Sequence, residues 1–283
     1  MFSWQILLAI SVVTYSVSVL LQKVLLKNNK SDPVAYSVVF QLVTGILIGI
    51  YALVNGFKMP DLIPLIPNLI LMVVFYGAGN VFVFKALKEA DASSFTIVFS
   101  TRAIWSILGA LIFLKESFSM QQLFGTILII SSVVLVSWKS GGLKINRGLI
   151  YSLIGALAFG LGFTNDAFLL NNFDVPSYLT IAFILPALAV WIVNPKATNK
   201  MGPLFEKQTL KKLLILAAIY AISSITIFLA YQVGKNASQI APLNQTATIL
   251  TVILSMVFLK ETDNYFVKIA GAIISFVGVV LVM

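Results

Sequence analysis

One arginine stands inside a long apolar segment, where a charged side chain needs a chemical reason to be. Arg102 occurs in the stretch FSTRAIWSILG, within an apolar run over residues 92–114. If this run crosses a membrane as a helix, a rise of about 1.5 Å per residue puts the guanidinium roughly 15 Å deep, near the bilayer midplane. A cation there costs at least ~2.5 kcal/mol unless it meets a carboxylate, a water-filled cavity or an anionic ligand. Because a guanidinium binds carboxylate and phosphate groups bidentately, Arg102 is a candidate for substrate binding, and a structural ion pair is the alternative.

Asp166, in the stretch GFTNDAF, is the one acidic residue well inside an apolar segment. It lies near the end of segment 147–170, so a direct pair with Arg102 would require a distorted helix. The chain contains no histidine, which is the commonest proton carrier. Asp166 is therefore the candidate for proton coupling, with H⁺ as the coupling ion. The alternative is an ordinary carboxylate at a helix end in the membrane interface.

Uncharged polar residues recur at helical spacing in several apolar segments. Such side chains either line a cavity or hydrogen-bond to neighbouring helices. Two stripes have this spacing: Ser11, Tyr15, Ser18 and Gln22 in the first segment, and Asn244, Thr248, Thr251 and Ser255 in the ninth. Together with polar and aromatic residues of other segments, they give the candidate substrate-binding set: Arg102, Tyr15, Tyr76, Asn80, Trp105, Asn244, Thr248, Tyr220 and Ser224.

The composition explains where these side chains must be held. Only 10% of residues are charged, 59% are hydrophobic and the mean hydropathy is +1.00, which is typical of a membrane protein. The net charge of +9 is spread between apolar runs and forms no continuous basic face, so nucleic acid is not expected as a partner. Without cysteine or histidine there is no thiolate or imidazole for a metal site or a nucleophile. We expect no metal, no cofactor and no enzymatic activity.

The apolar runs are long enough to cross a bilayer as helices, which needs about 20 residues each. They are apolar on every face, whereas a barrel would show short alternating segments. The N-terminal run has no basic leader and no cleavage signal, so we interpret it as a retained span. The expected spans number ten: 3–26, 33–55, 64–88, 92–114, 119–138, 147–170, 176–194, 210–233, 238–259 and 264–283.

The chain is a duplication. The tetrapeptide FLKE occurs at residues 113–116 and again at 258–261, and the same shift of 145 aligns Ala92, Ser93 and Thr101 with identical residues. The two copies, residues 1–141 and 146–283, hold five helices each. Because five is odd, the second copy is predicted to be inverted in the membrane. The FLKE lysine suits a helix end, and Ser117, Ser119, Thr262 and Asn264 are candidate caps of the following helices. The alternative is a direct gating role for Glu116 and Glu261.

Order, spacing and duplication together resemble a known family. The turns KALKEADASSF and VGKNASQIAPL, each before a fourth helix, and FLKE before a glycine-containing fifth helix resemble the EamA-type members of the drug/metabolite transporter superfamily. The resemblance covers nearly the whole chain. It implies an all-α basket of ten helices around a central cavity, lined by the first, third and fourth helices of each copy. It also implies a proline midway along each fourth helix; here Ala103 replaces the first and Pro242 comes earlier, so different kinks are expected.

The resemblance implies a secondary transporter, an exporter or exchanger of small metabolites such as amino acids or other small organic anions. It would work by alternating access in the cell membrane, surrounded by lipid, as a monomer or weak oligomer. A nucleotide-sugar or sugar-phosphate exchanger of the same superfamily is one alternative. A scaffold or receptor that transports nothing is another, although it would need neither Arg102 nor inward polar stripes. A membrane-embedded transferase would need clustered Asp, His or Cys residues, which we do not find.

The distribution of basic residues predicts the orientation. Fifteen lysines and arginines lie in the loops after the odd-numbered helices, whereas the opposite side has only Lys58, Lys115 and Lys235. By the positive-inside rule, both termini are therefore outside the cytoplasm. Ten-helix bacterial relatives are usually drawn the other way round.

Overall fold

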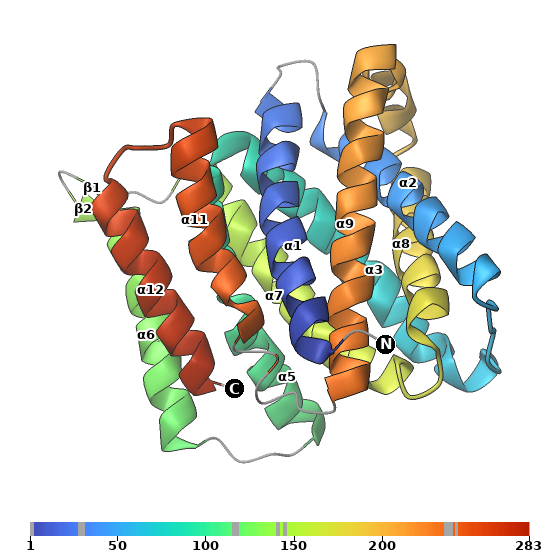
Figure 1. Cartoon of the computed structure of the whole chain (residues 1–283), viewed down its shortest axis with the longest axis horizontal. Coiled ribbons are helices and arrows are strands. Elements are labelled where there is room, and N and C mark those ends of the chain that lie inside the picture. The colour runs from blue at the N-terminus through green and yellow to red at the C-terminus, as the bar shows by residue number, and fades with distance from the viewer. Residues whose placement is uncertain are drawn as a thin grey trace.

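The computed structural model describes residues 3–27, 32–114, 119–139, 142–143, 146–234, 240 and 243–282. These residues are almost entirely helical, apart from one short antiparallel pair formed by β1 (Trp138–Lys139) and β2 (Gly142–Leu143). Eight of the described helices are long and apolar enough to cross a membrane, and a ninth apolar helix is shorter. The protein is thus a multi-pass helical bundle (Figure 1).

The two copies contribute corresponding helices. The first contains α1 (Trp4–Lys27), α2 (Pro33–Val54), η1 (Ile63–Leu65), α3 (Ile66–Glu89), α4 (Ala92–Phe99), α5 (Arg102–Leu114) and α6 (Met120–Ser137). The second contains α7 (Arg147–Leu169), α8 (Val175–Val193), η2 (Pro195–Lys200), η3 (Gly202–Phe205), α9 (Lys207–Gly234), α11 (Thr246–Leu259) and α12 (Tyr265–Val282). Most of these bounds agree with the expected spans.

The fourth helix is an exception, because it is broken in both copies. Residues 92–114 were expected as one helix, but Ser100 and Thr101 form a turn between α4 and α5. The Thr101 hydroxyl donates to the carbonyl of Val98 (2.8 Å), a local bond that competes with the helical ladder. In the second copy Gln245 forms the turn before α11, and the Thr246 hydroxyl donates to Leu243 (2.6 Å).

The two breaks fall at matching positions, 145 residues apart, with the same threonine bond. The expectation of different kinks stays a prediction, because a shared break position does not fix the kink of either helix. That expectation rested on proline, whereas threonine carries the shared bond, and Pro242 lies outside the described residues.

Contacts between the copies are reciprocal. α1 packs against α9 and α3 against α7, so that the first helix of each copy meets the third of the other. α2 packs against α8, and α6 against α12. Exchanging each helix for its counterpart reproduces the same set, as a twofold relation requires. In Figure 1, α1 starts on the side of the chain termini and α7 starts on the opposite side, beside β2, so the repeats are inverted.

Two close approaches depend on glycine. A Cβ atom on Gly125 of α6 would lie 2.5 Å from the carbonyl oxygen of Gly278 in α12, so the two helices could not pack as they do. A Cβ on Gly160 of α7 would lie 2.4 Å from the carbonyl oxygen of Arg102. Gly160 therefore allows α7 to lie directly against the start of α5, which fixes the position of Arg102.

The second helix of each copy begins with an aspartate cap. Asp32 accepts from the backbone N–H groups of Val34 and Ala35, and Asp174 accepts from that of Ser177. Asp32 also pairs with Lys200 of η2 (2.9 Å). Burial opposes ionisation of Asp32, but the Lys200 bond and the backbone bonds outweigh it and hold its pKa below the usual value. Ser119 forms a capping box with Gln122 at α6, as one of the expected caps.

The bundle has two chemically distinct ends. The end of α1, the start of α9 and the end of α11 lie together at the upper edge of Figure 1, whereas the chain termini lie at the lower edge. We call the upper end the lysine-rich face, because α1, α3, α6, α8 and α11 end there, and these helices end the odd-numbered spans expected from the sequence. We call the lower end the termini face. Between them, large apolar side chains such as Phe124 (63% exposed) and Phe266 (71% exposed) face outward, as lipid contact requires.

Candidate substrate cavity

A cavity of about 690 Å³ lies between the two copies. Its wall combines residues of α1, α3, α4, α5, α7, α8 and α9 with Asn244, Gln245 and Ala247 at the second helix break. The helices named by the family resemblance thus contribute, and so does α8, which had not been expected. A cavity of this size accommodates a small metabolite.

The cavity is closed at one end. At the lysine-rich face its lining residues are buried: Gln22 is 3% exposed, and Phe84 and Phe95 are 1% exposed. Toward the termini face, the wall includes Gln232, which is exposed near the end of α9. The structure therefore describes a cavity that reaches outward on the termini face and is sealed on the lysine-rich face.

Arg102 lies at the wall, at the first position of α5. Its guanidinium nitrogens lie 3.5 Å from the Tyr15 hydroxyl and 3.4 Å from Oε1 of Gln245, both long for hydrogen bonds. The guanidinium carbon is 4.7 Å from the centre of the Phe99 ring. Arg102 forms no ion pair within the described part of the chain, where the two ion pairs involve other residues. A structural partner is thus not found there, and the cation faces the cavity.

Asp166 lies in the wall as well, 3% exposed and held by two tyrosines. The hydroxyl of Tyr76 in α3 donates to Oδ2, and the hydroxyl of Tyr178 in α8 donates to Oδ1. The carboxyl group therefore joins the first copy to the second inside the protein and is no exposed helix-end group. It has no bond to Arg102.

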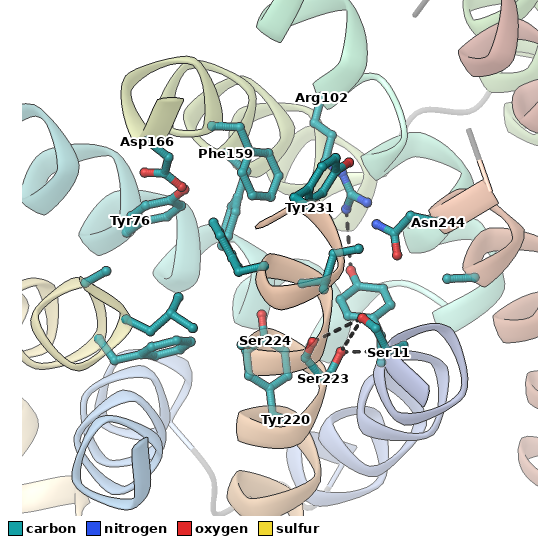
Figure 2. Close-up of a pocket in the computed structure, with 18 of the residues that line it drawn as sticks. Ser11, Tyr76, Arg102, Phe159, Asp166, Tyr220, Ser223, Ser224, Tyr231 and Asn244 are labelled. Carbon is teal, nitrogen blue, oxygen red and sulfur yellow. Dashed lines mark hydrogen bonds between the residues drawn. The ribbon is translucent and has the colours of Figure 1, made fainter. Parts of the chain in front are cut away.

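The Phe159 ring separates these two groups. Its centre lies 5.3 Å from that of Tyr76 on one side and 5.4 Å from that of Phe99 on the other, edge to face in both cases. Figure 2 shows Phe159 between Asp166 with Tyr76 and Arg102 with Tyr231. The cavity thus has an arginine lobe and an aspartate lobe. The arginine lobe comprises Arg102, Tyr15, Tyr231, Asn244 and Gln245, and the aspartate lobe comprises Asp166, Tyr76 and Tyr178.

Most of the residues selected from the sequence lie at this wall: Arg102, Tyr15, Tyr76, Asn80, Asn244, Tyr220, Ser224 and Asp166. Trp105 and Thr248 do not. Trp105 packs against α7 at Gly160, and Thr248 is buried in α11. Thr248 was selected at helical spacing from Asn244, but the turn at Gln245 lies between the two residues, so they do not share one continuous helix face.

The two polar stripes divide between cavity and packing. In α1, Ser11, Tyr15 and Gln22 line the cavity, while the Ser11 hydroxyl also contacts the carbonyl of Ser223 at 3.1 Å. Of the four stripe residues in the ninth segment, only Asn244 reaches the wall. The remainder of that stripe, Thr248, Thr251 and Ser255, is buried against other helices.

Sequence reasoning missed several wall residues. Gln245 occupies the helix break and faces Arg102, and its position, 145 residues after Ser100, was a signal that could have found it. Tyr178 was not detectable, because its approach to Asp166 depends on the turn between α7 and α8. Phe159 and Phe99 were indistinguishable from ordinary apolar core residues.

Comparison with known proteins identifies the fold. The sequence model of the EamA-like transporter family matches residues 2–138 and again residues 146–283. The chain belongs to this family. The two matches are the two copies, so this EamA-like protein is a membrane transporter of the drug/metabolite transporter superfamily. No curated protein sequence matches the chain significantly.

Chains of known structure share the architecture, and 27 of them match. One crystal structure aligns with a TM-score of 0.62 at 14% sequence identity, over 95% of this chain and 96% of its own. At that identity the likeness shows the fold alone.

Proposed function

We propose that this EamA-like protein is a secondary transporter that exports or exchanges a small organic anion by alternating access, and that it catalyses no reaction. The observation that carries the proposal is Arg102, whose guanidinium faces the cavity without a carboxylate partner among the described residues. A desolvated cation of this kind is stabilised by an anion that enters with its own charge. A single chain encloses the cavity, which supports a functional monomer in the cell membrane.

The lining supports a substrate with one anionic group and an apolar body. A carboxylate or phosphate would bind the guanidinium, with Tyr15, Asn244 and Gln245 within the same lobe. Beyond it the wall is mainly aromatic, with the Phe99 and Phe159 rings edge to face. Asp166, which carries the one carboxyl group among the described wall residues, is occupied by two tyrosine hydroxyls. We therefore favour a monoanion without an ammonium group over a zwitterionic amino acid.

The aspartate lobe supports H⁺ as the coupling ion. An ionised carboxylate accepts both tyrosine bonds, whereas a protonated carboxyl group carries a proton of its own and presents one acceptor fewer. Protonation of Asp166 would therefore weaken the link between Tyr76 in α3 and Tyr178 in α8. Because these helices belong to different copies, the proton would favour a movement of one copy against the other.

Ligand-induced stabilisation tests the substrate class. Purified protein is heated with an aromatic monocarboxylate, an aliphatic monocarboxylate, an amino acid and a sugar phosphate, since a ligand at about 100 times its dissociation constant adds about 2.7 kcal/mol. We expect the aromatic monocarboxylate to stabilise most. Arg102→Gln should abolish that shift, whereas Arg147→Gln, which removes the exposed arginine at the start of α7, should preserve it. Equal stabilisation of the Arg102→Gln variant would rule out the anion site.

Asp166→Asn tests proton coupling in liposomes. The amide keeps one acceptor oxygen for a tyrosine but no longer exchanges a proton. Exchange of labelled for unlabelled substrate at equal pH should continue within about threefold, a change of less than 1 kcal/mol. Accumulation driven by a pH gradient should disappear. Undiminished accumulation in this variant would remove Asp166 from the coupling mechanism.

A further inference from the structure

A glutamate of the second copy caps a helix of the first. Glu261 follows α11, and its Oε1 accepts from the backbone N–H of Ala92 at 2.8 Å. Its Oε2 accepts from the backbone N–H of Ser93 at 3.0 Å and from the Ser93 hydroxyl at 2.7 Å. The carboxylate therefore binds the N-terminus of α4 with three bonds, where the helix dipole favours a negative charge.

The cap comes from the other copy although a local residue was at hand. Asp91 occupies the N-cap position of α4, yet its side chain makes no capping bond. It pairs instead with Lys268 of α12 at 3.0 Å. Lys268 is 5% exposed and also lies 3.5 Å from the carbonyl oxygen of Glu261. The side chain of Asp91 and the backbone N–H groups that it would normally cap are thus both engaged with the second copy.

A lysine of α1 joins the same cluster. The Lys23 ammonium donates to the carbonyls of Leu87 (2.8 Å) and Ala90 (2.7 Å) at the end of α3. The connection between α3 and α4 is therefore held from α1 on one side and from the second copy on the other. We call the contacts of Glu261 and Lys268 with residues 91–93 the cross-copy latch.

The latch lies where the cavity is sealed. It binds the start of α4, one turn before Phe95, a buried wall residue at the lysine-rich end of the cavity. Phe99, one turn further on, also lies in the wall, and the helix ends there at the break. Because α4 has only eight residues, its position depends strongly on what holds its start.

We propose that the cross-copy latch keeps the cavity shut on the lysine-rich face and must open for the cavity to face that side. The proposal rests on the alternating access proposed above. All its bonds join one copy to the other, so they break when the copies move apart at this face. The latch residues recur in sequence, since Glu116, Ala237 and Ser238 match Glu261, Ala92 and Ser93. Those three counterparts lie outside the described residues.

Thiol labelling measures the opening directly, because the natural chain has no cysteine. Val83→Cys places a thiol at the sealed end of the cavity, at a wall position 8% exposed. Gln232→Cys places one at the open end. Each reporter is combined with Glu261→Gln or Ser93→Ala in sealed vesicles. A membrane-impermeant maleimide is then added to one side at a time.

Release of the latch should change the two labelling rates in opposite directions. Losing a charge-assisted cap should raise labelling of the Val83→Cys reporter from the lysine-rich side about tenfold and lower that of the Gln232→Cys reporter from the other side. Ser93→Ala removes one of three bonds and should give a smaller rise. Asp263→Asn, an exposed change in the same loop as Glu261, should give none.

Partial unfolding can be told apart from opening of the latch, because a loosened protein would be labelled faster at both cysteine reporters. An unchanged rate at Val83→Cys in both latch variants would overturn the proposal, as would faster labelling at both ends or a rise with Asp263→Asn. None of these measurements requires substrate. The latch proposal can therefore fail independently of the proposed transport function. That function is tested by the binding of anions to the wild-type protein.

Discussion

The two helix breaks share one backbone design and differ in charge. Each has a threonine at the break, and the threonine hydroxyl donates to the carbonyl three residues back. After the threonine, the first copy has Arg102 and the second has Ala247, at matching positions. The turn residues differ too: the Ser100 hydroxyl contacts that of Ser275 in α12, whereas Gln245 faces the arginine.

This comparison separates what duplication preserves from what it leaves free. The break recurs at the same position with the same threonine bond in both copies, and both breaks lie at the cavity. The positive charge belongs to one side chain, Arg102. A single residue difference between the copies therefore puts the charge on one side of the cavity only. A twofold scaffold can alternate between two faces, while a substrate with one anionic group needs only one cation. The charge of Arg102 and the helix break should therefore be separable by mutation.

The largest effect is expected from a variant that removes the charge of Arg102 and leaves the helix break in place. Arg102→Ala makes the first break resemble the second. Losing a desolvated anion contact costs about 2 kcal/mol or more, so flux should fall at least about 30-fold in liposomes. Arg102→Lys keeps the charge but not the planar fork and should recover only part of it. The melting temperatures of both variants should stay near that of the wild type. Wild-type flux in Arg102→Ala would show that the break itself, and not the charge, recognises the substrate.

The next effect concerns the residue that the second break contributes. Gln245→Ala removes an acceptor 3.4 Å from the guanidinium but leaves the cation in place. Since the bond is long, its loss should weaken substrate binding by about fivefold, or about 1 kcal/mol. Gln208→Ala, which removes an exposed glutamine at the start of α9, is the control. If Gln245→Ala is as damaging as Arg102→Ala, the two breaks act as one unit and the comparison fails.

The duplication, and with it the architecture, was predictable from the sequence because the aligned residues are identical. The broken fourth helix was not, since Thr101 and Thr246 are compatible with a continuous helix, and serines within unbroken helices, such as Ser132 and Ser255, make the same hydroxyl bond. Arg102 was predictable because a charge in an apolar run has few explanations. Its neighbour Phe99 was not, because it meets the guanidinium only after α4 and α5 have folded against each other. Gln245 carried one signal, its position 145 residues after Ser100, but its contact with Arg102 forms only when the two copies pack together. The tyrosine clamp on Asp166 depends in the same way on contacts between the copies.

Two smaller effects test the threonine bond that the two breaks share. Thr101→Val and Thr246→Val keep the side-chain shape and remove the bond that each break has in common. The hydroxyl of Thr101 is buried, so its loss should cost about 1 kcal/mol of unfolding free energy, while the more exposed Thr246 should cost about half of that. Denaturant unfolding in detergent measures both. A loss of several kcal/mol at one site and none at the other would show that the two breaks are built differently.

The smallest effect concerns the aspartate caps of α2 and α8. Both copies have the cap, but the two aspartates have different partners. Asp32 caps α2 and pairs with Lys200, whereas Asp174 caps α8 and leaves its second oxygen buried without a hydrogen-bond partner in the described residues. The Lys200 bond and the backbone bonds outweigh burial and lower the pKa of Asp32 in the folded protein. A lowered folded pKa means that the unfolded chain binds more protons near pH 4, so this stabilisation is present above about pH 4 and is lost as the pH falls through the folded pKa.

Solvent screens the pair of Asp32 and Lys200, so its stabilisation should amount to no more than about 0.5 kcal/mol. Asp32→Asn keeps the cap but not the charge, and Lys200→Gln removes only the partner. Both should flatten the fall in melting temperature between about pH 5 and pH 3. A fall as steep as in the wild type in both variants would mean that Lys200 contributes nothing to this end of the bundle.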